Sequence, residues 1–326
     1  MTVEFKGSAS PESQRIAKIL RRSVYPFIAS VATKPDLERY SRRYRAVMEP
    51  LTAAARPPRG TKTRQLDLGG FRGELTHLLP RFGPRAAPGR IVLYFHGGAF
   101  ISGSIRSHRR ISAQISRATG GVPVLSIAYR LMPQHSIGQS IADGLTAYDV
   151  LLRSGYAAQD VVFAGDSAGG NLVFSVAVAA RERGLPMPAA LVAMSPWADL
   201  DAEIHLASPN RDLDAYLAAE SISTVVAFHE KKFGPLPEES SPVAADLVGM
   251  PPALIQVGST EILRDDAQRL HDRLEAAGCT VTLQIWDKQF HVFQAWYDVI
   301  PEAREAVAEI ATFITANLAR GEATDD

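Results

Sequence analysis

The 326-residue sequence has a single cysteine, Cys279, so no intramolecular disulfide can form. A chain without disulfides suits a reducing compartment, and we expect a cytoplasmic protein. The first residues, MTVEFKGSASPESQ, lack the apolar stretch of a secretory signal. No apolar run approaches the ~20 residues needed to cross a bilayer, so we expect no stable membrane insertion.

The sequence also lacks an excess of charge of either sign, because 35 lysines and arginines balance 35 aspartates and glutamates. This balance argues against a polyanionic partner, and we expect no nucleic acid to bind. The charge is nevertheless uneven, since residues 1–64 contain 14 basic and 5 acidic side chains. The simpler interpretation is the solvated face of one or two helices. The alternative is an arm that meets an acidic surface, such as lipid headgroups or the rest of the protein.

Short apolar runs without polar alternation recur along the chain and predict strands that are covered on both faces. Helical patterns lie between them, at Ile141–Leu152, Asn171–Arg183 and Ala267–Ala277. This alternation predicts the α/β class, with a mostly parallel central sheet flanked by helices. The six predicted strands are Ile91–Phe95, Val122–Tyr129, Val161–Ala164, Ala190–Met194, Ala253–Val257 and Val281–Trp286.

Two segments break this rhythm. Residues 1–60 are rich in arginine, are expected to be helical, and end in the breaker run RPPRG. Residues 198–240 are polar and are expected to contain one or two helices. An insertion after the carboxyl end of a strand lies over the active-site edge of such a sheet. We therefore expect both segments to form a helical cap on a catalytic domain of residues 61–197 and 241–326.

The strongest chemical signal is the run GDSAGG at residues 165–170, between a predicted strand and a predicted helix. A serine at such a sharp turn is held in a strained backbone conformation with its hydroxyl exposed, and the flanking glycines avoid clashes with neighbouring backbone. The helix N-terminus adds the positive end of a dipole where an oxyanion develops. The placement predicts that Ser167 is a nucleophile.

A second signal is the run His96-Gly97-Gly98-Ala99-Phe100, directly after a predicted strand. Glycines leave backbone N–H groups bare, so that a substrate oxygen can approach them closely. Acyl transfer needs such donors for its tetrahedral intermediate, and loss of one donor costs ~10²–10³ in rate. We expect an oxyanion hole made of the N–H groups of Gly97, Gly98 and Ala168.

A nucleophilic serine needs a histidine base, and the base needs a carboxylate to fix its tautomer. In this fold the order along the chain is nucleophile, acid, histidine. His291 follows the last predicted strand and a short loop, which is the place expected for the base. Of the other histidines after the nucleophile, His205 and His229 fall in the polar insertion. His271 falls in a helix, where we expect it on the solvated side.

The acid is expected just beyond the strand Ala253–Val257, where the loop contains Glu261, Asp265 and Asp266. Both aspartates are well placed to cap the helix that follows, so they already have a structural role. This leaves Glu261 as the favoured acid and Asp265 as the alternative.

With these segments the sequence resembles the hormone-sensitive-lipase-like esterases, bacterial family IV of the α/β-hydrolase superfamily, from about residue 90 to 318. The resemblance implies an α/β-hydrolase fold, a triad of Ser167, an acid and His291, the oxyanion hole above and the two-part cap. It implies no metal and no organic cofactor, and a possible homodimer, because many relatives are dimers. The other matching motifs are YRLxPxH at 129–135, SPWxDL at 195–200 and Ser241-Pro242.

Three positions depart from the family pattern. Ala99 stands in place of the third glycine of the HGGG-type motif, and Glu261 stands where most relatives have aspartate. Glutamate can still bond the imidazole, although its extra methylene changes the angle of approach. Residues 136–139 lack the prolines usual in relatives.

These observations predict a carboxylesterase that hydrolyses short- to medium-chain esters through a serine acyl-enzyme, with a small-molecule ester as its partner. One alternative is an amide or formamide hydrolase with the same triad. Another is a non-catalytic small-molecule receptor on the same fold, which would be expected to lose a triad member. Candidate walls of the substrate pocket, each of which could equally be a core residue, are Phe100, Trp197, Tyr216, Leu217, Phe228, Phe290, Val292 and Phe293.

Overall fold

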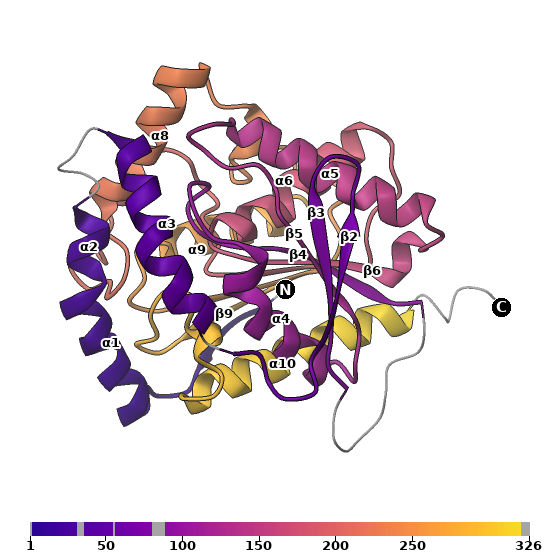
Figure 1. Cartoon of the computed structure of the whole chain (residues 1–326), viewed down its shortest axis with the longest axis horizontal. Helices are drawn as coiled ribbons and strands as arrows, with labels where there is room; N and C mark the ends of the chain where they lie inside the picture. Colours follow the sequence, from indigo (N-terminus) through magenta and orange to yellow (C-terminus); the bar gives the residue numbers. More distant parts are fainter. Residues whose placement is uncertain (1, 31–35, 55, 80–88, 321–326) are drawn as a thin grey trace.

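A sheet of nine strands forms the centre of the computed structural model, which describes residues 2–30, 36–54, 56–79 and 89–320 (Figure 1). The strands are β1 (Thr2–Lys6), β2 (Lys62–Asp67), β3 (Arg72–His77), β4 (Ile91–Phe95), β5 (Val124–Ile127), β6 (Val161–Asp166), β7 (Ala190–Met194), β8 (Ala253–Gly258) and β9 (Val281–Trp286). Their spatial order is β1-β9-β8-β7-β6-β4-β5-β3-β2. All neighbours are parallel except for the pairs that involve β3, so the predicted mostly parallel sheet is confirmed.

All six predicted strands are present, with small changes at their ends. Every residue of β4, β6, β7 and β8 is buried, as expected for apolar runs that are covered on both faces. The run at 122–129 gives a shorter strand than predicted, Val124–Ile127.

Three strands at the two edges of the sheet, β1, β2 and β3, were not predicted from the sequence. In β2 five of the six residues are exposed, so an edge strand of this kind shows no apolar run. β1 pairs in parallel with β9, placing Thr2 opposite Thr282. The expectation that residues 1–60 are helical is therefore wrong for residues 2–6, which belong to the central sheet.

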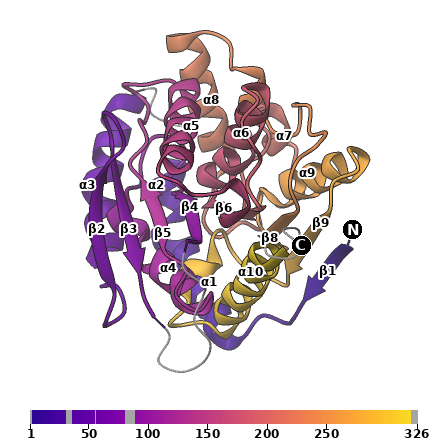
Figure 2. The ribbon, with the colours of Figure 1, turned by 90° about the vertical axis from the view of Figure 1, so that its right-hand side faces the viewer.

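Helices cover both faces of the sheet (Figure 2). Packed on one face are α4 (Ile105–Ala118) and α10 (Pro301–Arg320), and on the other α5 (Ile137–Arg153), α6 (Ala168–Glu182) and α9 (Arg264–Ala276). Apolar residues of α4 and α10 contact one set of strand side chains and those of α5, α6 and α9 contact the alternate set. Since the predicted nucleophile, acid and base, Ser167, Glu261 and His291, follow β6, β8 and β9, they meet at the carboxyl edge of the sheet.

The remaining helices, α1 (Pro11–Ser23), α2 (Tyr25–Ala29), α3 (Leu37–Ala54), α7 (Ala202–Leu206) and α8 (Ala219–Phe233), come from the two segments expected to form a cap. The two segments contact each other directly. The hydroxyls of Tyr44 and Tyr216 lie 3.2 Å apart, and Ser221 Oγ donates a 2.9 Å hydrogen bond to Ile28 O. Among the described helices, none is both long and apolar enough to span a membrane.

Candidate active site

Ser167 lies at the turn between β6 and α6, with φ 55° and ψ −121°. A non-glycine residue with positive φ is strained by roughly 1–2 kcal/mol, so its surroundings must hold it there. The N–H of Ser167 donates to Met194 O at 2.9 Å. Two residues on, Gly169 approaches β4 so closely that a Cβ there would lie 2.0 Å from Phe95 O. The GDSAGG run therefore forms the sharp turn that its glycines predicted, with the serine side chain directed to a cavity.

His291 and Glu261 are in direct contact. His291 Nδ1 lies 2.9 Å from Glu261 Oε2, and both side chains are buried. The second oxygen, Glu261 Oε1, accepts hydrogen bonds from Ser195 Oγ at 2.8 Å and from Gly258 N at 2.6 Å. With both oxygens bound, the carboxylate is fixed in orientation, and it selects the tautomer of His291 with the proton on Nδ1.

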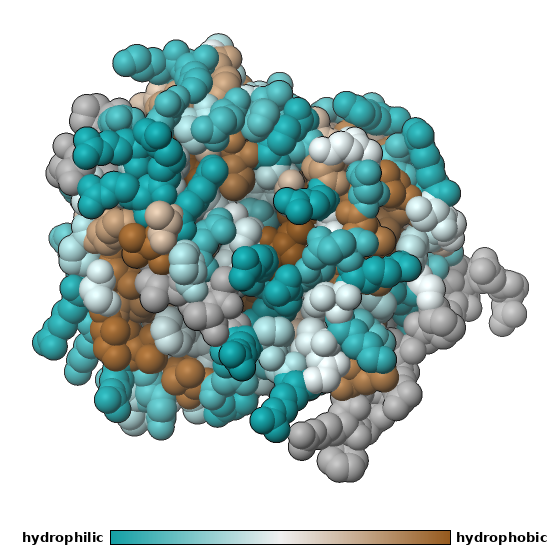
Figure 3. Space-filling view, in the orientation of Figure 1, coloured by the Kyte–Doolittle hydropathy of each residue, from teal (hydrophilic) through white to brown (hydrophobic). Residues whose placement is uncertain are grey.

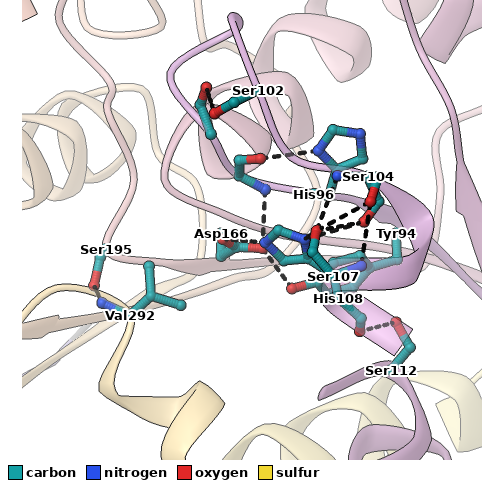
Figure 4. A network of polar contacts seen from close by, with 12 residues as sticks. Tyr94, His96, Ser102, Ser104, Ser107, His108, Ser112, Asp166, Ser195 and Val292 are labelled. Carbon is teal, nitrogen blue, oxygen red and sulfur yellow. Dashed lines mark hydrogen bonds and ion pairs between the residues drawn. The ribbon is translucent and has the colours of Figure 1, made fainter. Parts of the chain in front are cut away.

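Ser195 links the acid to the segment that carries the base. Its hydroxyl donates to Glu261 and accepts a 3.1 Å hydrogen bond from the N–H of Val292, the residue after His291 (Figure 4). Ser195 and Val292 have φ of 47° and 52°, so both are in the left-handed region that β-branched residues in particular avoid. The sequence analysis quoted Ser195 only as part of a family motif, without a role.

The surroundings of His291 favour its protonated form. Burial by itself lowers the pKa of this imidazole, but the hydrogen bond and charge of Glu261, helped by the charges of Asp214 and Asp166, raise it above its ordinary value. A raised pKa strengthens the imidazole as a proton acceptor from a hydroxyl.

Asp265, the alternative acid, does not contact the base. Its Oδ2 accepts a 3.1 Å hydrogen bond from Ser208 Oγ. The expectation that both aspartates cap α9 is wrong, because the N-cap is Leu263, with no side-chain cap hydrogen bond. Asp266 is buried and accepts instead from the backbone N–H of Ala198, among others.

The remaining histidines after the nucleophile are all buried, which corrects the expectation that His271 is solvated. His271 lies on the same side of α9 as Ala267, Leu270 and Leu274, which is the stripe that packs on the sheet. His205 pairs with Asp266 at 2.9 Å, away from Glu261.

The oxyanion donors expected at the HGG run are arranged differently from the prediction. The N–H of Gly97 already donates to Asp166 Oδ1 at 3.2 Å. The N–H groups of Gly98, Ala99 and Ala168 have no hydrogen-bond partner within the described part of the chain. Gly98 has φ 124° and Ala99 has φ 53°, and both line the cavity together with Ser167. Ala99 was not predicted as a donor, because the motif was judged there by its side chain and not by its backbone N–H.

Asp166 organises a buried polar network beneath this loop (Figure 4). Besides Gly97, it accepts a 2.6 Å hydrogen bond from Tyr94 OH, and its Oδ2 lies 3.3 Å from His108 Nε2. Burial raises the pKa of Asp166, but the charge and hydrogen bond of His108 outweigh it, so the pKa is lowered. Asp166 therefore remains ionised. It holds residues 96–98, the HGG loop, against the turn that carries Ser167.

A cavity of about 530 Å³ is lined by Ser167, His291 and the two glycines of the HGG loop. Three of the predicted pocket residues, Tyr216, Leu217 and Val292, line it. Charged residues such as Glu49, Arg110 and Asp298 also line it. The two segments expected to form a cap contribute eight further apolar residues to its wall: Ile19, Leu20, Val24, Ile28, Tyr40, Tyr44, Ile222 and Val225.

The other five candidate pocket residues do not line this cavity. Phe100, Trp197, Phe290 and Phe293 are at most 2% exposed and pack in the core, and Phe228 is half-buried against the same core. Apolar side chains are buried both in a core and in a cavity wall, so residue type alone does not separate the two.

The insertion binds the backbone of the loop that carries Glu261. Asn210 Nδ2 donates to Ser259 O at 2.9 Å and to Glu261 O at 2.8 Å. The buried Asp214 accepts from the N–H of Ile262 at 2.8 Å through one oxygen, and from Tyr216 and Leu217 through the other. One carboxylate therefore joins the cavity wall to the acid loop.

One group of side chains in the described residues has the spacing to hold a metal ion. His271, Asp272 and Glu275 on α9 place ligand atoms within 4.8 Å of one another. None of the three lines the cavity, and two of them are exposed, so this group has no part in the geometry around Ser167.

Proteins similar to this chain in sequence or in structure include several that are named as esterases. A family model described as alpha/beta hydrolase fold matches residues 92–295. An acetyl-hydrolase of Streptomyces hygroscopicus is 36% identical over 73% of this chain and 79% of its own length, and an esterase of Acinetobacter venetianus is 30% identical over 88% and 93%. A crystal structure of an esterase from the bacterial hormone-sensitive lipase (HSL) family matches with a TM-score of 0.82 and 33% identity, covering 96% of this chain and 100% of that one. The chain therefore belongs to the bacterial hormone-sensitive lipase family of the α/β-hydrolase fold and is a carboxylic-ester hydrolase.

Proposed function

We propose that the protein hydrolyses short- to medium-chain carboxylic esters through an acyl-enzyme on Ser167, with His291 as base and Glu261 as acid. The observation that carries this proposal is the 2.9 Å contact of His291 with Glu261, on the wall of the cavity into which Ser167 projects. Nucleophile, base and orienting carboxylate in one place are what acyl transfer by serine requires.

In the first half of the reaction, Ser167 Oγ bonds to the ester carbonyl carbon while its proton passes to His291 Nε2. The carbonyl π electrons move to the oxygen and give a tetrahedral oxyanion. Collapse of this intermediate breaks the bond to the alcohol oxygen, which leaves with the proton from His291. In the second half, water repeats the attack with His291 as base and releases the carboxylic acid.

The oxyanion is received by the free N–H groups of Gly98, Ala99 and Ala168. The N–H of Ala168 is at the first turn of α6, where the helix dipole also favours negative charge. Gly97, one of the three donors expected from the sequence, positions the loop instead through its hydrogen bond to Asp166.

The substrate class follows from the cavity. Its size of about 530 Å³ and its apolar wall suit the hydrocarbon part of a small ester better than a long lipid chain. The acetyl-hydrolase among the relatives is named for a short acyl group.

A panel of p-nitrophenyl acetate, butyrate, octanoate and palmitate tests both activity and chain preference. We expect turnover of the first three and little of palmitate, and loss of ~10⁴–10⁶ in kcat for Ser167→Ala. Serine-to-alanine substitution at Ser154, which is exposed at the end of α5, is the matched control and should leave kcat unchanged. Turnover by Ser167→Ala within tenfold of the parent protein would contradict the proposed nucleophile.

Two further measurements with the preferred acyl group separate the alternatives. A p-nitroanilide of the preferred acyl group, cleaved faster than the ester, would identify an amidase. Binding of an ester without turnover would indicate a receptor on this fold. A homodimer and a cytoplasmic location are further parts of the proposal, and light scattering on the purified protein tests the first.

A further inference from the structure

The outer face of α1 combines cations with an exposed apolar residue. Arg15, Lys18, Ile19 and Arg22 follow the spacing i, i+3, i+4, i+7, which places them on one face of a helix. All four are exposed, whereas Leu20 on the opposite side is buried against the C-terminal part of the chain. The face is therefore presented to the surroundings of the protein.

The three cations of this face have no ion pair or hydrogen bond to another described residue. On α3, which also lines the cavity, the exposed Arg39, Arg42 and Arg43 add further positive charge. The cap helices thus concentrate positive charge in a protein whose net charge is zero.

Exposed apolar side chains lie on α1, on α3 and in the cavity wall. Ile19 is 48% exposed, Val47 of α3 is 47% exposed and Val299 is 45% exposed. Ile19 and Val299 also line the cavity that contains Ser167. Figure 3 shows an apolar area in the part of the view where Figure 1 draws α1 and α3, with hydrophilic side chains along its margin.

We propose that this face of α1, with the adjoining cavity rim, docks on an anionic lipid surface. Cationic side chains attract such a surface while an apolar residue between them enters the boundary of headgroups and acyl chains. The long stems of lysine and arginine let the charges stay in water while the helix approaches. Docked in this way, the cavity opens toward the phase in which an apolar ester concentrates.

Charge argues for lipid and against a second copy of the chain as the occupant of this face. A two-fold interface places the same patch on both partners, so the cations of one copy would meet those of the other. Like charges at contact distance repel, whereas anionic headgroups neutralise them.

Cosedimentation of the full chain with vesicles tests the proposal. We expect binding to phosphatidylcholine vesicles that contain phosphatidylglycerol, weak binding to phosphatidylcholine alone, and release by added NaCl. Each cation near an anionic surface contributes about fivefold in affinity, so the triple variant R15Q/K18Q/R22Q should bind about a hundredfold more weakly.

The matched control removes three cations at the other end of the sheet. Arg117, Arg153 and Arg183 lie at the C-terminal ends of α4, α5 and α6, and R117Q/R153Q/R183Q should keep vesicle binding. Thermal unfolding by circular dichroism verifies that both triple variants are folded. Equal binding of the parent protein to both vesicle types, unchanged binding of R15Q/K18Q/R22Q, or no binding at all would overturn the proposal. So would a dimer that this variant loses while vesicles leave the parent protein in the supernatant.

Discussion

Asp214 of the insertion accepts a 2.8 Å hydrogen bond from the backbone N–H of Ile262, the residue next to Glu261. Its second oxygen accepts from the N–H groups of Tyr216 and Leu217, which line the cavity. The insertion therefore does more than cover the site, because it also fixes the loop that supplies the proposed acid.

Asp214→Asn should lower kcat by about tenfold to a hundredfold with a smaller change in KM. The amide keeps one acceptor oxygen, but it loses the charge and leaves a backbone N–H without a good partner, which typically costs ~1–3 kcal/mol. Steady-state kinetics on p-nitrophenyl butyrate measures the split. Asp212→Asn, an exposed position in the same segment, is the control. Equal effects of the two substitutions would show that Asp214 has no special role.

The pH profile offers a second test of the same residue. His291 must be neutral to accept a proton, so activity falls as the pH drops through its pKa, which Glu261, Asp214 and Asp166 raise. Removing the negative charge of Asp214 lowers this pKa, and the acidic limb of kcat/KM for Asp214→Asn should move to lower pH. Burial first, and then the charge of Glu261, raise the pKa of Asp214 itself to about 6, so in the parent protein this support weakens below that pH. An acidic limb that stays in place would contradict the electrostatic role.

Glu261→Gln should reduce kcat by ~10²–10⁴, because an amide no longer stabilises the imidazolium and no longer selects the tautomer with a proton on Nδ1. Asp265→Asn should stay within threefold of the parent protein, since Asp265 bonds Ser208 and not the base. The two variants are compared by kcat under saturating substrate. A severe loss from Asp265→Asn alone would reverse the assignment of the acid.

Ser195→Ala should reduce kcat by about tenfold and destabilise the protein by ~1–3 kcal/mol. Its hydroxyl is the partner of both Glu261 Oε1 and Val292 N, and both are left without it. Urea unfolding and kinetics measure the two effects. If stability falls but kcat does not, Ser195 serves the fold and not the orientation of the acid.

Two substitutions in and beside the HGG loop should have different effects on kcat. Gly98→Ala places a Cβ 2.3 Å from Ser102 O and should lower kcat by ~10²-fold or more by displacing a donor. Ala99→Gly keeps the N–H and relieves a residue with φ 53°, so kcat should stay within threefold. Equal tolerance of both substitutions would argue against the proposed oxyanion hole.

Local patterns predicted six of the nine strands, and they singled out Ser167, His291 and Glu261 because each of these residues directly follows or lies near a recognisable apolar strand. Glu261 was preferred as the acid partly because Asp265 and Asp266 were expected to cap α9. Neither aspartate does so with its side chain. Contacts between distant segments were not accessible in this way. Ser195 lies 66 residues from Glu261, and Asp214 lies 48 residues from Ile262.

The pocket was the least predictable part of the site. Phe100 and Trp197 face the core while Tyr216 and Leu217 face the cavity, although all four occur in segments near the catalytic residues. Hydrophobicity predicts burial, but the side toward which a buried residue points depends on how cap and sheet meet. The edge strand β1 was not predicted because its residues are mostly exposed and form no apolar run.

The most direct test of the central claim is covalent labelling with diethyl p-nitrophenyl phosphate, followed by mass spectrometry of the peptides. We expect one diethylphosphoryl group per chain on Ser167, loss of activity in proportion to labelling, and no label in Ser167→Ala. A label on another serine that tracks the loss of activity, or full activity in a chain labelled at Ser167, would contradict the central claim.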